Sequence, residues 1–120
     1  SRIISDPAQR LINQEDHGTV ALFSSVIYSN SYIQLEPRAK YSKLVLYVDV
    51  DGDDVDLRIT NRNDPINTVV MQSVKLTAAD GLKEITLDIT GIQTLSVDVM
   101  TVEPNRQAAV RIAMDKSYYQ

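Results

Sequence analysis

The sequence predicts an all-β domain, an antiparallel β-sandwich of about eight strands. Two observations lead to this fold class. Short segments rich in Val, Ile, Leu and Thr alternate apolar and polar side chains along most of the chain, which is typical of half-buried strands. Turn-forming residues separate these segments at roughly ten-residue intervals, the spacing of strands in sandwiches and barrels.

Eight segments are expected to form strands, and one face of each is expected to point to the core. By residue number they are 19–28, 32–36, 44–50, 55–60, 68–76, 83–90, 94–101 and 107–114. The first is apolar on both faces, which predicts a central strand or one that meets another subunit. In segment 68–76, Val70, Val74 and Leu76 are expected on one face, and Val69 and Met71 on the other.

The domain organisation is expected to be simple, because 120 residues suit one domain with a sizeable core. We expect an N-terminal arm over residues 1–18, the sandwich over 19–116 and a C-terminal tail over 117–120. The arm alternates weakly and contains Pro7, so it is either an extended arm that packs on a neighbour or a frayed terminus. The tail carries two adjacent tyrosines, and aromatic residues anchor protein interfaces.

The clearest pattern spans residues 43–61, where two alternating runs flank the segment Asp-Gly-Asp-Asp at 51–54. Such a sequence predicts a β-hairpin. A turn centred on residues 52–53 pairs Val50 with Val55 and sets Asp49 opposite Asp56 on the outer face. A turn centred on residues 51–52 shifts the pairing by two and keeps the same faces.

Five carboxylates crowd the tip of this predicted hairpin: Asp49, Asp51, Asp53, Asp54 and Asp56. A bound Ca²⁺, which takes about six to eight oxygen ligands, would offset the repulsion between them. The spacing is not that of an EF-hand, since Gly52 stands at the fourth loop position and Thr60 replaces the bidentate Glu. The other interpretation is a solvated acidic turn in which Asp and Gly serve the turn geometry.

The composition excludes several function classes. A net charge of -4 argues against a nucleic-acid partner, and no apolar run approaches the ~18 residues of a membrane span. Cysteine is absent, which excludes disulfides, thiolate catalysis and zinc sites of the cysteine type. This suits a reducing cytoplasm, or a particle assembled there. The first residues lack the charged-then-apolar pattern of a signal peptide.

Catalytic motifs are also missing from the sequence. His17 is the single histidine and lies in the weakly patterned arm. No Gly-x-Ser-x-Gly segment and no phosphate-binding Gly-rich loop occurs. A glycosidase needs only two carboxylates, but the sequence singles out no pair among its 16 acidic residues. We therefore expect a protein that is not an enzyme and holds no cofactor, apart from the Ca²⁺ considered above.

Residues 85–99, with Gly91 followed by the pattern Leu95-x-Val97-x-Val99, resemble the paired late strands of galactose-binding-type jelly-roll domains. The resemblance covers fifteen residues. It implies a jelly-roll-like sandwich, a structural calcium and a sugar site on loops. The chain departs from this family in having no tryptophan, so only tyrosines and Phe23 remain to stack on a sugar.

Two functions follow as hypotheses. The first is a non-catalytic structural or assembly protein, such as a bacteriophage virion decoration, capsid-stabilising or tail-associated protein. It would act through protein–protein contacts as a homo-oligomer or in a larger assembly, in the virion or in the cytoplasm before assembly. The second is a secreted carbohydrate-binding module of the jelly-roll type. Candidate residues for partner or glycan binding are Tyr32, Arg38, Tyr41, Tyr47, Tyr118 and Tyr119.

Overall fold

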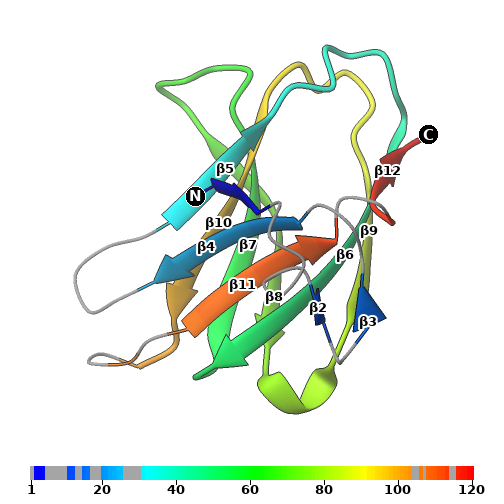
Figure 1. The fold of residues 1–120 in the computed structure, drawn as a ribbon. Coiled ribbons are helices and arrows are strands. Elements are labelled where there is room, and N and C mark those ends of the chain that lie inside the picture. Colours follow the sequence, from blue (N-terminus) through cyan, green and yellow to red (C-terminus); the bar gives the residue numbers. More distant parts are fainter. Residues whose placement is uncertain are drawn as a thin grey trace.

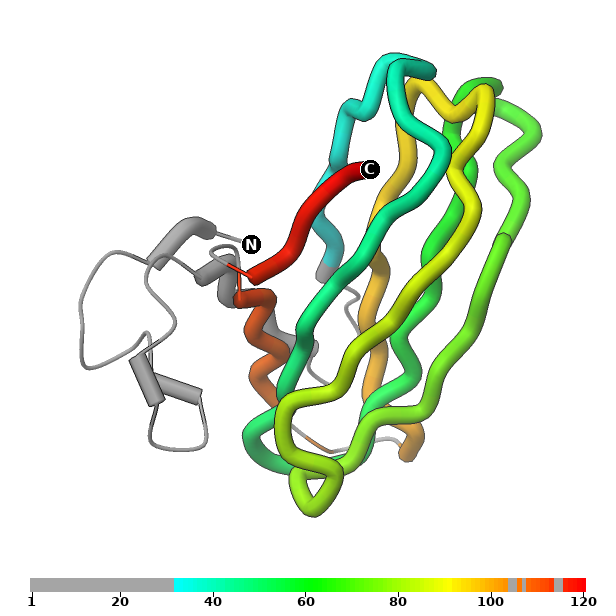
Figure 2. Tube along the Cα trace, turned by 90° about the vertical axis from the view of Figure 1, so that its right-hand side faces the viewer, coloured from blue at the N-terminus to red at the C-terminus, as the bar shows by residue number. Residues whose placement is uncertain are grey.

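The structure, a computed structural model, describes residues 2–4, 11–12, 15–16, 20–25, 31–103, 106, 108–113 and 116–120. Nearly all of this part of the chain is β-structure, in two antiparallel sheets packed face to face (Figures 1 and 2). No helix in the described ranges has the length and apolar character needed to cross a membrane. The predicted all-β sandwich is confirmed.

The first sheet contains β9 (Lys83–Asp88), β6 (Lys43–Gly52), β11 (Ala108–Ala113), β4 (Val20–Ser25) and β1 (Arg2–Ile4), in that order. The strand β12 (Tyr118–Tyr119) continues beyond β11 along the same edge of β6. The second sheet is ordered β5 (Ser31–Leu35), β10 (Leu95–Thr101), β7 (Val55–Asn61), β8 (Val69–Leu76). The short strands β2 (Leu11–Ile12) and β3 (Glu15–Asp16) pair with each other.

The strand order is that of a jelly roll. From β4 to β11 the chain changes sheet at every connection except the one between β7 and β8, and such repeated crossing produces the double-sheet jelly roll. A one-turn 3-10 helix, η2 (Ala78–Asp80), connects β8 to β9. All eight predicted strand segments correspond to strands β4 to β11.

The core lies between the sheets and is built by the inward residues of both. Leu46 and Val48 of the first sheet face Leu57 and Val97 of the second, and all four are almost fully buried. The alternation therefore predicted the inward faces correctly for β6, β7, β9, β10 and β11. Burial of these aliphatic side chains, about 1.5–3 kcal/mol each, is the main stabilising term of the fold.

The prediction for strand β8 is wrong at one position. Leu76 and Val74 share one face as expected, and that face points inward, with Val55 and Leu57 as their neighbours on β7. A β-bulge opposite Ile59 and Thr60 then adds one residue to β8, which reverses the alternation. Val70 consequently lies exposed, while Met71 packs against the core.

The predicted hairpin between β6 and β7 is wrong in its pairing. These strands lie in different sheets, and the turn at residues 51–54 carries the chain from one sheet to the other. Val50 pairs with Val110 of β11, and Val55 pairs with Leu76 of β8. Alternation shows which side of a strand is apolar, but it does not show which strand is its neighbour. Strands β6 and β7 both have an apolar side, and these two sides face the same core from opposite sheets.

The C-terminal residues, expected to be a tail, add a strand to the first sheet. Tyr118 and Tyr119 pair with Val45 and Leu44 of β6, and the backbones of Lys43 and Gln120 exchange two hydrogen bonds of 3.0 and 2.9 Å. In the expected N-terminal arm, β1 pairs with β4, and the remaining prediction for residues 1–18 falls mostly outside the described residues.

Replacing Val48 with Asp should unfold the domain, because Val48 is fully buried between the sheets and an unpaired carboxylate there costs about 4 kcal/mol or more. The matched control is Val69→Asp on β8, where the side chain is exposed. Circular dichroism during thermal unfolding measures both. A Val48→Asp variant that melts like the control would contradict the assigned core.

Deleting residues 117–120 should destabilise the domain by about 3 kcal/mol, because it removes strand β12 and the packing of Tyr119 against the core. Urea unfolding gives the free-energy difference. The single variant Tyr118→Ser serves as control, since half of that side chain is exposed. Equal unfolding midpoints for the deletion and the intact chain would show that β12 contributes nothing.

Candidate functional site

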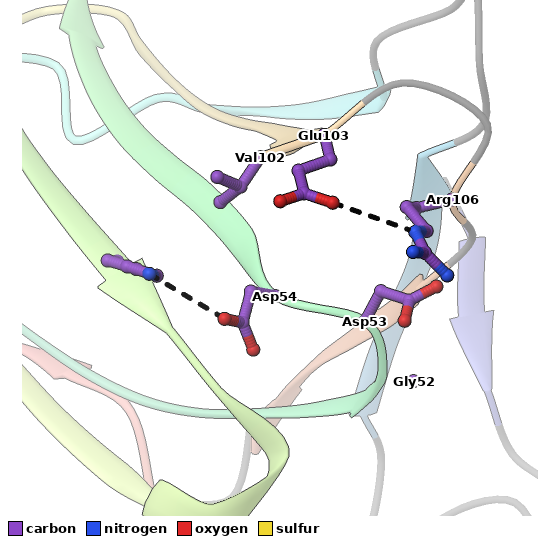
Figure 3. A pocket seen from close by; sticks show the side chains of 7 residues that line it. Gly52, Asp53, Asp54, Val102, Glu103 and Arg106 are labelled. Atoms are coloured by element: carbon purple, nitrogen blue, oxygen red, sulfur yellow. Dashed lines mark ion pairs between the residues drawn. The ribbon is translucent and has the colours of Figure 1, made fainter.

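The turn between β6 and β7 borders a polar cavity of about 310 Å³ at one end of the sandwich (Figure 3). It is larger than a second, apolar cavity of about 80 Å³ that lies beside strand β12. Three segments distant in sequence line it: the acidic turn, strand β8 and the connection that follows β10. The lining residues are Gly52, Asp53, Asp54, Lys75, Val102, Glu103 and Arg106.

Ion pairs hold the charged side chains of this cavity. Lys75 Nζ lies 3.6 Å from Asp54 Oδ2, and Arg106 Nε lies 3.9 Å from Glu103 Oε2. Asp53 points toward Arg106 in Figure 3. The wall thus combines three carboxylates with two cations, and the two ion pairs neutralise most of its charge. Exposed pairs of this kind contribute about 0–1 kcal/mol each.

The five aspartates proposed for calcium do not assemble. Asp49 and Asp51 belong to β6 in the first sheet, Asp56 lies on β7 in the second sheet, and Asp53 and Asp54 lie at the turn. Within the described residues, no group of three or more His, Cys, Asp or Glu side chains is placed to hold a metal ion. The ligand cluster that the calcium hypothesis requires is therefore not formed.

Asp49, expected on a solvent-facing side, is buried and paired. Only 3% of its surface is exposed, and Arg111 Nη2 donates a hydrogen bond of 3.1 Å to its Oδ1. The arginine is its direct neighbour on β11. The prediction that Asp49 lies opposite Asp56 is wrong, because its neighbour is Arg111. A partner 62 positions away cannot be inferred from a local sequence pattern.

The tyrosines named as binding candidates mostly serve the fold. Tyr41 stacks on Tyr119, with ring centroids 4.8 Å apart, and burial together with the nearby Tyr41 raises the pKa of Tyr119. Tyr47 donates a hydrogen bond of 2.7 Å from its hydroxyl to Glu84, and this bond raises the pKa of Tyr47. These three residues anchor the C-terminal strand and join β6 to β9.

The remaining candidates are separated from one another. Tyr118 is half-exposed beside β6. Arg38 lies in an exposed turn, in the left-handed backbone conformation at φ 58°, with a weak ion pair of 4.0 Å to Glu36. Tyr32 lies on β5 in the second sheet, with a guanidinium over its ring. The predicted binding residues thus do not converge on one site.

Two surfaces of the folded domain were not predicted from the sequence. The first is the β8 apolar strip, defined as Ile66, Val69 and Val70, whose exposed fractions are 88%, 60% and 51%. The second is a polar cluster around Asp98 on the outer face of the second sheet. The uncharged run at residues 65–74 was a signal for the strip, but no local pattern indicated the cluster.

Comparison with known proteins supports the fold alone. No protein-family model and no curated protein sequence matches the chain. Among solved structures, the chain is similar to the crystal structure of the Yersinia pseudotuberculosis-derived mitogen, with a TM-score of 0.54. The two share 7% sequence identity over 78% of this chain and 81% of the mitogen. At this identity the likeness concerns the architecture, a host to unrelated functions.

Replacing Asp49 with Asn should lower the free energy of unfolding by about 2 kcal/mol, because the partly buried Arg111 loses the buried charge it is paired with. The matched change Asp54→Asn breaks the exposed pair with Lys75 and should cost less than about 0.5 kcal/mol. Urea unfolding of both variants checks this. Equal effects would mean that the Asp49 pair is no more important than a surface pair.

Proposed function

We propose that this jelly roll is a non-catalytic structural or assembly domain that acts through protein–protein contacts, beginning with a second copy of itself. The observation that carries the proposal is the β8 apolar strip. Ile66, Val69 and Val70 lie within five residues of one another and expose at least half of their surface. Exposed aliphatic side chains concentrated in one short segment are typical of interaction surfaces.

The backbone of β8 supports the same proposal. Among the described strands, β8 stands at the end of the second sheet and pairs only with β7, so its outer edge offers N–H and C=O groups to another strand. Edges are commonly protected by charged residues or proline. Residues 66–74 contain neither, and Lys75 at the far end is paired with Asp54.

A second copy of the chain fits this edge. Two β8 strands related by a two-fold axis run antiparallel, and a register centred between Gln72 and Ser73 sets Val69 opposite Leu76 and Val70 opposite Lys75. No like charges meet in that register, since the strand carries a single charged residue. Pairing would extend the sheet across both copies, which is the isologous contact typical of homodimers.

The cavity supports a role without catalysis. Among the described residues its lining contains no histidine, serine or cysteine, so they form no Ser–His or Cys–His pair there. Asp54 and Glu103 are each paired with a cation, whereas a glycosidase acid needs an environment that keeps it protonated. The bacteriophage virion setting considered from the sequence remains a hypothesis about where such an assembly domain works.

Val70→Lys should weaken self-association by about tenfold or more, because it places a charge at the edge used for pairing. Light scattering over a concentration series should give twice 13.4 kDa for the unchanged chain and a shift toward the monomer for the variant. Val102→Lys is the matched control, a half-exposed valine outside the β8 apolar strip and not on the β8 edge. A chain that stays monomeric at all concentrations, or a control that dissociates equally, would contradict the proposal.

A further inference from the structure

The outer face of the second sheet carries small polar side chains that water does not reach. Ser96 is fully buried and Thr60 is 5% exposed, although both alternate with core residues and therefore point away from the core. The Asp98 side chain beside them is 18% exposed. Outward residues of an antiparallel sheet ordinarily meet solvent, so these three must be covered by something else on the face.

The Arg62 side chain lies against this group and holds it together. Its Nε donates a hydrogen bond of 2.6 Å to Ser96 Oγ, and its Nη2 lies 3.7 Å from Asp98 Oδ1. Thr60 Oγ1 donates a hydrogen bond of 2.7 Å to Asp98 Oδ2. The guanidinium carbon also lies 5.5 Å from the centre of the Tyr32 ring, within cation–π range. Charge-assisted contacts of this kind fix the positions of the groups before any ligand arrives.

Arg58 differs from Arg62 in having no such partners. It is partly buried on β7, with Asp98 and Ser73 as its neighbours across the sheet. In the part of the chain that the structure describes, it makes no ion pair or hydrogen bond through its side chain. A partly buried guanidinium without a partner is unfavourable, and its planar set of donors fits a carboxylate bidentately.

Tyr32, Asp98 and Arg58 lie in register on three adjacent strands, β5, β10 and β7. Two strand spacings separate the tyrosine from the arginine, about 10 Å between backbones. Tyr32 keeps 53% of its surface exposed. A sugar ring stacked on Tyr32 can therefore extend a carboxylate toward Arg58, while the Arg62–Asp98 pair offers donors and acceptors to its hydroxyl groups.

We propose that this face, with Tyr32, Arg58, Arg62 and Asp98, binds a saccharide that carries a carboxylate. Tyr32 contacts the ring, Arg58 binds the carboxylate, and Arg62 and Asp98 orient the hydroxyl groups. This site goes beyond the assembly role, because it uses the outer face of the second sheet and not the edge of β8. Self-association and saccharide binding can therefore be tested separately, one by light scattering and the other by ligand titration.

The experiment is a titration of the ¹⁵N-labelled full chain with sodium glucuronate, and with glucose at equal ionic strength, followed by amide chemical shifts. Glucuronate should shift amides along β5, β7 and β10. Glucose, which lacks the carboxylate, should bind about tenfold more weakly at the same strands. Absence of shifts on these strands with glucuronate would overturn the proposal. Sodium acetate that reproduces the shifts at the same concentration would also overturn it, because the site would then recognise any carboxylate.

Variants of the proposed binding residues test which side chains contact glucuronate. Arg58→Gln should reduce glucuronate affinity about tenfold, to the level of glucose, and Tyr32→Ala should weaken both ligands. Lys116→Gln, which removes an exposed cation near the first sheet, is the matched control and should change nothing. Arg58→Lys keeps the charge without the planar fork and should bind at an intermediate level, with the amide spectrum reporting the fold. Unchanged binding by Arg58→Gln would overturn the assignment.

Discussion

The whole structure depends on the burial of two apolar faces against each other. Neither sheet can remove its inward Val, Leu and Ile side chains from water alone, since a sheet with one apolar face needs a second layer. The fully buried residues Val48 and Leu57 come from different sheets and meet in one core. The jelly-roll crossings follow from this requirement, because alternate strands supply opposite walls of the same core.

Since the inward positions are apolar, the charged residues occupy the outer faces and the turns, and their partners come from neighbouring strands. Asp49 meets Arg111 across the first sheet, and Asp54 meets Lys75 across the end of the sandwich. Aspartates that stand close in sequence are thereby separated in space. An acidic segment that suggested a metal site becomes a set of structural ion pairs, and the cavity at its tip contains cations beside its carboxylates.

The two surfaces proposed to bind partners are therefore distinct from the acidic turn that the sequence pattern indicated. The β8 apolar strip lies at an open edge, where a further strand can be added without disturbing the core. The cluster around Asp98 lies on the outer face of the same sheet, where Tyr32, Asp98 and Arg58 lie in register on three adjacent strands. A domain with these two surfaces can associate through one and bind through the other.

The sequence by itself determined the class of fold, the eight strand segments and nearly all inward faces, because a period of two and turn residues are local properties. Only the tertiary structure decided which strands are neighbours. The segment around Gly52 looked like a hairpin yet connects two sheets, and the bulge in β8 exposed Val70. Pairing depends on contacts between residues far apart in the chain, such as Asp49 with Arg111 or Thr60 with Asp98. No local pattern contains that information, so the candidate sites became visible only in the folded chain.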